Sequence, residues 1–188
     1  MNKLIGLDLD GVIFKLVNHF GEYGVSARLE REIEIVDGLD DLLDALVDKG
    51  YVIVGITNQP DIARKKISPQ FLNKKHKLLQ RKYPQIKKIY ICSHTETDLC
   101  SCRKPKPGLL LQADKDFKVD FSQSWVIGDS RPDIEAGTLV HAKTILIQTK
   151  YNCGDPSLAI CTAVARNVEK SLRLVLDIEN KKANLVDV

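Results

Sequence analysis

The sequence contains no long apolar run. None of its hydrophobic stretches approaches the roughly 20 residues that a membrane-spanning helix needs. The first residues also lack a charged segment followed by an apolar one, so we expect no secretory signal. No segment is repeated and no linker divides the chain. We therefore expect one domain over residues 1–188, located in the cytoplasm and without a membrane partner.

A strong excess of one charge is absent as well. The chain has 28 Lys and Arg against 25 Asp and Glu, and the net charge of +3 is too small to indicate nucleic-acid binding by itself. Acidic residues are missing, however, from residues 64–88, which contain ten Lys or Arg. This stretch is either a solvated helix face or a positive field that attracts a phosphorylated substrate. Aromatic residues are too sparse there to favour base stacking.

Cysteine is scarce, and four metal donors are close together. Cys92 and His94 precede a five-residue gap that ends at Cys100 and Cys102. Three thiolates and one imidazole make a complete tetrahedral set for structural Zn²⁺, with no open position for catalysis. Buried free cysteines and an oxidised pair are the alternatives, although a disulfide framework is unusual in a chain without a secretory signal.

Short apolar runs alternate with amphipathic segments along the chain. The runs predict strands at residues 3–9, 51–56, 88–91, 124–127 and 143–147. The amphipathic segments predict helices at residues 39–47, 61–82 with a break at Ser68-Pro69, 109–116, 132–139 and about 156–179. We expect residues 12–36 to form a loop with at most one helical turn. The alternation predicts an α/β fold with a doubly wound parallel sheet.

Polar residues follow three of the predicted strands. Asp8 and Asp10 end the first strand, Thr57 and Asn58 end the second, and Asp129 follows the fourth. Because the carboxyl ends of parallel strands share one edge of a sheet, these side chains are expected to meet in one crevice.

Two carboxylates one residue apart suit phosphoryl transfer through an aspartyl phosphate. One carboxylate can attack phosphorus, and the other can protonate the leaving alcohol and then activate water. A magnesium ion held by carboxylates and phosphate oxygens offsets the repulsion between the two anions. Hydroxyl, amide and lysine donors neutralise the charge on the transferred group.

Four motifs in order carry a resemblance to a known family. They are Asp8-Leu9-Asp10-Gly11, Thr57-Asn58, Lys104-Pro105, and Gly128-Asp129-Ser130 with Asp133. The sequence thereby resembles the haloacid dehalogenase superfamily of phosphohydrolases over roughly residues 3–150. The resemblance implies a Rossmann-like core and a magnesium-dependent phosphoric monoester hydrolase that acts on a small phosphorylated metabolite. It leaves open whether the protein is a monomer or a small homo-oligomer.

The resemblance also implies roles for the acidic residues. Asp8 matches the nucleophile and a magnesium ligand. Asp10 matches the general acid and base, and its backbone carbonyl matches a second magnesium ligand. Asp129 matches the magnesium carboxylate, whereas Asp133 matches an acidic residue behind the metal ligands. Thr57, Asn58 and Lys104 match the groups that bind the transferred phosphate.

The cysteine-rich segment narrows the resemblance to a group within the superfamily. Together with Arg103 and Lys104 it resembles the D-glycero-D-manno-heptose 1,7-bisphosphate phosphatases and the histidinol-phosphate phosphatase domain. In the heptose group, the arginine that matches Arg103 binds the second phosphate of the substrate. The short gap between His94 and Cys100 is closer to the histidinol-phosphate type. A nucleic-acid 3′-end phosphatase is a further alternative, which the sparse aromatic residues do not favour.

The sequence departs from the pattern of the heptose group at several positions. Leu9 stands where the group has arginine, Phe14 where an Asn or Asp is common, and Pro60-Asp61 where Ser-Gly is usual. All of these positions lie where a substrate is touched. Residues 12–36 are too few for a large cap domain, so we expect an open site with the zinc loop as one wall.

Overall fold

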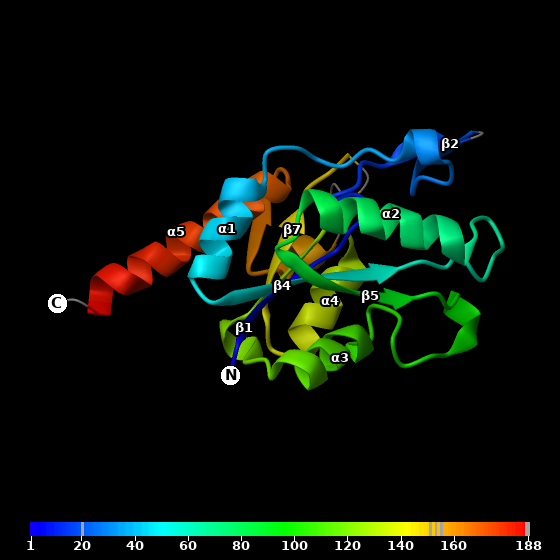
Figure 1. Ribbon diagram of the computed structural model, residues 1–188. Helices are drawn as coiled ribbons and strands as arrows, with labels where there is room; N and C mark the ends of the chain where they lie inside the picture. Colours follow the sequence, from blue (N-terminus) through cyan, green and yellow to red (C-terminus); the bar gives the residue numbers. More distant parts are fainter. Residues whose placement is uncertain (20, 151, 153, 155, 187–188) are drawn as a thin grey trace.

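The computed structural model describes residues 1–19, 21–150, 152, 154 and 156–186. A six-stranded sheet with the order β5-β4-β1-β6-β7-β8 runs through the molecule, and every neighbouring pair in it is parallel (Figure 1). The strands are β1 (Lys3–Leu7), β4 (Tyr51–Asn58), β5 (Ile86–Cys92), β6 (Trp125–Gly128), β7 (Lys143–Ile147) and β8 (Ala163–Ala165).

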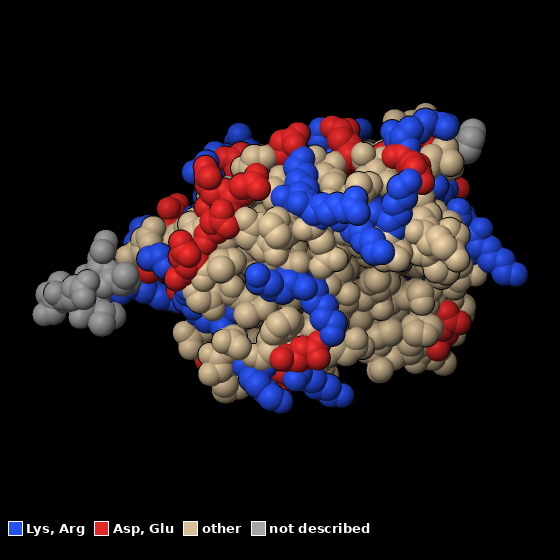
Figure 2. Space-filling view, in the orientation of Figure 1, with Lys and Arg blue, Asp and Glu red and all other residues tan. Residues whose placement is uncertain are grey.

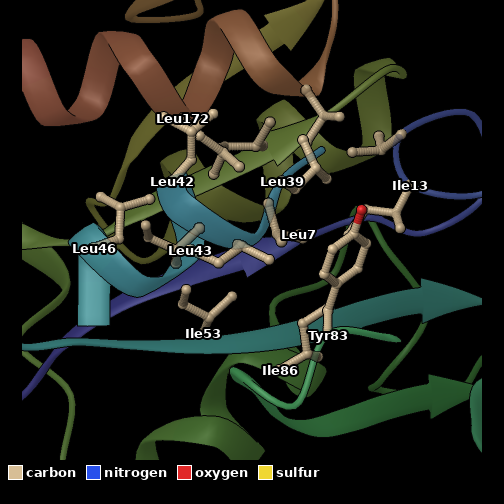
Figure 3. Close-up of a cluster of buried hydrophobic side chains, with 14 of the residues drawn as sticks. Leu7, Ile13, Leu39, Leu42, Leu43, Leu46, Ile53, Tyr83, Ile86 and Leu172 are labelled. Carbon is tan, nitrogen blue, oxygen red and sulfur yellow. The ribbon is translucent and has the colours of Figure 1, made fainter. Parts of the chain in front are cut away.

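Helices cover both faces of this sheet because the strands are apolar on both sides. One core contains Ile5 and Leu7 of β1, together with buried residues of α1 (Asp40–Asp48), α2 (Pro69–Lys82) and α5 (Val168–Val186); Figure 3 shows part of it. The other core contains Leu4, with residues of α3 (Gly108–Phe117) and α4 (Arg131–Leu139). The predicted doubly wound parallel sheet is confirmed.

The chain order creates a crevice at the carboxyl end of β1. From β1 the chain continues to β4 and β5 on one side, then returns to β6, β7 and β8 on the other. The loops after β1, β4 and β6 therefore diverge at this switch point, where open α/β sheets bind ligands. The described part of the chain has no helix long and apolar enough to cross a membrane.

The prediction of a loop over residues 12–36 was wrong in one respect. An antiparallel hairpin, β2 (Val17–His19) and β3 (Glu22–Val25), lies there, followed by a short 3₁₀ turn at Glu30–Glu32. Gly21 and Gly24 both have positive φ, which glycine adopts without strain. Strands of three and four residues are too short to give a clear alternating pattern. The described part of residues 12–36 contains this hairpin and no large cap.

Two predicted helix boundaries were also wrong. The predicted helix over residues 61–82 is helical only from Pro69, so the predicted break at Ser68-Pro69 is in fact the start of the helix. The hydroxyl oxygen of Ser68 accepts a hydrogen bond from the Phe71 amide there at 3.1 Å. The predicted helix over residues 156–179 is replaced by a 3₁₀ turn at Pro156–Ala159, strand β8 and helix α5. Strand β8 extends the sheet by pairing with β7, a tertiary contact that the helical periodicity of the segment conceals.

An ion pair between Lys3 and Glu179 joins the start of β1 to α5 at 2.7 Å. Burial alone raises the pKa of Glu179, but hydrogen bonds from Lys182 and Lys3 outweigh it and lower this pKa to about 2. A carboxyl group whose pKa is lower in the folded than in the unfolded chain stabilises the fold at pH values above its unfolded pKa, here about 4.5. This stabilisation is lost as the pH falls toward the folded pKa of about 2. We expect Glu179→Gln to reduce the free energy of unfolding at pH 7 by about 1–2 kcal/mol.

Urea unfolding at pH 7 and pH 3 measures this effect. The difference between wild type and Glu179→Gln should shrink by at least half at pH 3. Glu169→Gln is the matched control, because Glu169 lies on the same helix and forms an exposed pair with Arg173. A Glu179→Gln deficit that is equal at both pH values would contradict the electrostatic origin.

Candidate active site

A cavity of about 440 Å³ opens at the carboxyl end of β1. Seven of the predicted site residues line it, from the ends of β1, β4 and β6 and from the segment before α3: Asp8, Asp10, Thr57, Asn58, Arg103, Lys104 and Asp129. The hairpin also contributes to the wall through Glu22, Gly24 and Val25. The site is therefore bordered by the hairpin and by Arg103 and Lys104, whereas the cysteine-rich segment before them, which was expected to form one wall, contributes no lining residue.

Lys104 is the buried cation at the centre of the site. Its ammonium group donates to Asp8 Oδ1 at 2.7 Å, to the Ile56 carbonyl oxygen at 2.7 Å, and to Asp133 Oδ1. Burial opposes the charge, but Asp133 and Asp8 outweigh it and raise the pKa of Lys104 above its usual value. Lys104 therefore stays charged beside Asp8, where it can neutralise a phosphoryl group.

Three carboxylates crowd around this lysine. Oxygens of Asp8, Asp129 and Asp133 lie within 4.8 Å of one another. Burial raises the pKa of Asp8 well above its usual value, against the effect of Lys104. Burial, reinforced by Asp133, raises the pKa of Asp129 to about 7. This set of hard oxygen donors fits a divalent cation such as Mg²⁺, whose charge offsets their repulsion.

Asp133 is held from both sides. Besides the Lys104 contact, its other oxygen accepts hydrogen bonds from the Ser130 amide at 3.1 Å and from the Ser130 hydroxyl. The side chain is 1% exposed and does not line the cavity. Asp133 thus fixes Lys104 and the start of α4, and its place behind the metal ligands stays a prediction.

Close backbone approach brings Asp129 into the site. At Gly11, where φ is +88°, a Cβ atom would lie 1.9 Å from Asp129 Oδ2, so only glycine fits. The Asn152 amide donates to the Asp129 carbonyl at 2.8 Å and to the Ile147 carbonyl at 2.7 Å, which ties the loop after β6 to the end of β7. Sequence reasoning missed Asn152, because a single asparagine in a polar segment carries no local signal.

Asp10 has surroundings different from those of Asp8. Its Oδ2 accepts a hydrogen bond from Gln59 Nε2 at 2.6 Å, and its Oδ1 pairs with the ammonium group of Lys75. Gln59 Nε2 also donates to Thr57 Oγ1 at 3.0 Å. The two carboxylates of the first motif therefore have separate surroundings, one beside Lys104 and one beside Lys75, and their separate roles stay predictions.

Asn58 contacts the backbone of Lys104. Its Nδ2 donates to the Lys104 carbonyl oxygen at 3.0 Å, and its Oδ1 accepts from the Lys104 amide at 3.1 Å. These two bonds hold the lysine segment against the end of β4. The expected contact between Asn58 and phosphate stays a prediction.

Four cations lie around the cavity in a network of ion pairs. Arg28 contacts Asp61 at 2.8 Å and Glu22 at 2.8 Å, and Lys66 contacts Glu22 at 3.0 Å. Arg64 contacts Asp61 at 3.7 Å and Glu96 at 2.9 Å, and Arg103 contacts the Glu96 carboxylate. Sequence reasoning had no signal for Arg28, since it assigned no structure to the hairpin that precedes it.

The basic stretch of residues 64–88 is largely neutralised. Figure 2 shows Lys and Arg side chains over the face that carries α2, with acidic side chains among them. Acidic partners contact six of the ten cations: Arg64, Lys66, Lys74, Lys75, Lys82 and Lys88. This pairing weakens the case for a nucleic-acid surface.

The four predicted zinc donors converge. Cys92 Sγ lies 3.5 Å from His94 Nδ1 and 3.7 Å from Cys100 Sγ, and Cys102 Sγ lies 3.3 Å and 3.5 Å from the same two atoms. Tetrahedral sulfur ligands about 2.3 Å from zinc would be about 3.8 Å apart, so the set fits Zn²⁺. The sulfur separations exclude disulfide bonds among these three cysteines. Arg103 follows the set directly.

The fold and the site thus define a class: a Rossmann-like hydrolase with an aspartate, a lysine and a carboxylate cluster at the switch point. Residues 101–169 match the family described as HAD-hydrolase-like. The chain is 36% identical over 151 residues to a D-glycero-beta-D-manno-heptose-1,7-bisphosphate 7-phosphatase of Neisseria meningitidis, a match that covers 78% of each chain. It is 36% identical over 160 residues to the enzyme of that name from Haemophilus influenzae, covering 79% and 83%.

A solved structure supports the same assignment. The D,D-heptose 1,7-bisphosphate phosphatase of B. bronchiseptica, complexed with magnesium and phosphate, superposes with a TM-score of 0.76 at 27% identity, covering 93% of this chain and 98% of the other. This chain belongs to the haloacid dehalogenase-like hydrolases and is a phosphoric monoester hydrolase. Within them it belongs to the family of these heptose bisphosphate phosphatases.

Proposed function

We propose that this protein removes the 7-phosphate from D-glycero-beta-D-manno-heptose 1,7-bisphosphate, a step of carbohydrate metabolism. The observation that carries the proposal is one cavity that holds Asp8 with Lys104 at its base and Arg103 with Arg64 at its wall. A bisphosphate needs both a reacting end and an anion-binding end. The names of the relatives support this choice of substrate.

In the proposed reaction, Asp8 attacks phosphorus while Asp10 donates a proton to the departing sugar oxygen. The P–O bond to the sugar breaks, and an aspartyl phosphate forms. Asp10 then takes a proton from the water that attacks this intermediate, which releases phosphate and restores Asp8. Lys104 and Thr57 neutralise the charge of the phosphoryl oxygens through both steps, and Asn58 supports them by holding Lys104.

Magnesium and zinc have separate proposed roles. The Asp8 and Asp129 carboxylates and the Asp10 backbone carbonyl would hold Mg²⁺, which supplies positive charge to the phosphoryl group. Cys92, His94, Cys100 and Cys102 would hold Zn²⁺, which stabilises the segment that carries Arg103. Zinc takes no part in bond cleavage in this proposal. The cytoplasmic location and a monomeric or small homo-oligomeric state stay predictions.

Arg103→Ala tests the bisphosphate assignment. We expect the variant to raise the KM for heptose 1,7-bisphosphate about 10- to 50-fold with little change in kcat, because the lost contact acts on the non-reacting phosphate. The KM for heptose 7-phosphate should change less than about threefold. Arg173→Ala, which removes an exposed arginine on α5, is the control. An equal rise in KM for both substrates would contradict a contact with the second phosphate.

A substrate panel separates the proposed function from the alternatives. It contains heptose 1,7-bisphosphate, histidinol phosphate and 3′-phosphorylated oligonucleotides, each assayed for magnesium-dependent phosphate release. The proposal requires the highest kcat/KM for the heptose. Preference for histidinol phosphate would fit the short gap between His94 and Cys100 and would overturn the substrate assignment while leaving the reaction class intact.

A further inference from the structure

The buried lysine of α2 is not among the groups that the proposed reaction uses. Lys75 is 1% exposed, although its charge is costly to bury. It lies on the stripe of α2 that faces the core, together with Leu72, His76 and Leu79. An apolar side chain at this position would complete the stripe without a desolvation cost. Packing alone therefore does not explain why a lysine occupies this buried position.

Its contacts point to Asp10. The ammonium group pairs with Asp10 Oδ1, and Asp10 is itself only 10% exposed. The same ammonium group lies 4.3 Å from the centroid of the Phe14 ring, within the range of a cation–π contact. Phe14 is buried and belongs to the turn that follows Asp10, where its carbonyl oxygen accepts from the Gly11 amide. Phe14 and Asp10 together form the immediate surroundings of the Lys75 charge.

Gln59 completes this arrangement from the other side. Gln59, which follows β4, donates to Asp10 Oδ2, and Lys75 of α2 donates to Asp10 Oδ1. Each carboxylate oxygen of Asp10 therefore has its own donor. The Asp10 side chain is thereby fixed in a single orientation beside Thr57, which also contacts Gln59. A proton donor must be held in this way to reach the leaving oxygen as the bond breaks.

We propose that Lys75 is a positioning residue that sets the orientation of the Asp10 carboxyl group for proton transfer to the leaving alcohol. The inference rests on the proposed role of Asp10. Lys75 lies behind Asp10 and is not part of the cavity wall, so it acts through that carboxyl group and not on the substrate. Phe14 supplies the aromatic face on which the ammonium group rests.

Lys75→Met tests this role through the leaving group. The variant keeps the length of the side chain and removes its charge. A sugar alkoxide leaves only with a proton, whereas p-nitrophenolate leaves as an anion. The value of kcat/KM depends only on substrate binding and on the steps up to departure of the leaving group. Hydrolysis of the aspartyl phosphate comes later and does not affect it, so a change in kcat/KM reports on proton donation to the leaving group. We expect kcat/KM to fall about 10- to 100-fold for the sugar phosphate and less than about threefold for p-nitrophenyl phosphate.

Matched variants complete the experiment. Lys74→Met removes the neighbouring lysine, which pairs with Glu30 on the surface, and should leave both values of kcat/KM within about twofold. In an Asp10→Asn background, Lys75→Met should cause no further loss, because the residue acts through Asp10. Lys75→Gln, which keeps a donor without the charge, should fall between wild type and Lys75→Met and provides a second variant if the methionine chain fails to fold.

Four outcomes would overturn the inference. An equal loss of kcat/KM for both esters would indicate a general structural role for Lys75, and so would a further full loss in the Asp10→Asn background. A higher kcat/KM for the sugar phosphate in Lys75→Met would mean that the lysine holds Asp10 away from its working position. A wild-type protein that cleaves neither ester would contradict the proposed function and this inference with it.

Discussion

Asp8→Asn is expected to abolish magnesium-dependent phosphate release, with a fall in kcat of about 1,000-fold or more. The amide oxygen and nitrogen that replace the carboxylate cannot form the aspartyl phosphate. Lys104 would keep its contacts with Asp133 and the Ile56 carbonyl, so the fold should survive. Removal of one of three crowded buried carboxylates relieves repulsion in the metal-free protein, and we expect no loss of thermal stability.

Steady-state kinetics and circular dichroism together check this prediction. Labelled phosphate from the substrate should also appear on the wild-type protein after rapid acid quenching, and not on Asp8→Asn. Asp48→Asn, an exposed change at the end of α1, is the control for the loss of a carboxylate. A folded Asp8→Asn protein with an undiminished rate would rule out the covalent mechanism.

Loss of the zinc site is expected to have the second large effect, on metal content and on thermal stability. Protein purified without added metal should contain about one zinc per chain, and Cys92→Ser should contain little. Since a tetrahedral set closes the segment from Cys92 to Cys102, its loss should lower Tm by about 5–10 °C. Arg103 follows Cys102 directly and donates to the His94 carbonyl oxygen at 3.3 Å, so the KM for a bisphosphate should rise as well.

Elemental analysis and thermal unfolding measure these changes. Cys161→Ser, which alters a cysteine outside the set, should retain the zinc and the wild-type Tm. A chelator strong enough to remove zinc should reproduce the effect of Cys92→Ser on the wild-type protein. A Cys92→Ser protein with unchanged Tm and unchanged metal content would refute the zinc assignment.

The predicted strands and most of the predicted helices correspond to elements of the structure because their patterns are local. Buried parallel strands such as β1 and β4 are short, continuous apolar runs, and α1 has a clear apolar stripe. Strand β8 pairs with β7 at three positions and the two strands of the hairpin pair at two, which is too few to give such a pattern. Their strands gain stability from a neighbour, and three residues contain too few positions to show a period.

The sequence alone determined which chemical groups are available and the order in which they follow the strands. Asp8, Asp10 and Asp129 follow short, mainly apolar strands, and Thr57 lies near the end of another. A parallel sheet brings such strand ends to one edge whatever the details of packing. The four zinc donors were predictable for a similar reason, since they fall within eleven residues of chain, from Cys92 to Cys102.

Only the tertiary structure decided what surrounds each group. It placed Lys104 between Asp8 and Asp133, and it put Lys75 and Gln59 on the two oxygens of Asp10. These partners lie between 29 and 96 residues apart along the chain, so no local pattern relates them. The physical reason is that apolar burial fixes the position of α2 and β4, and the polar contacts follow from where those elements come to lie.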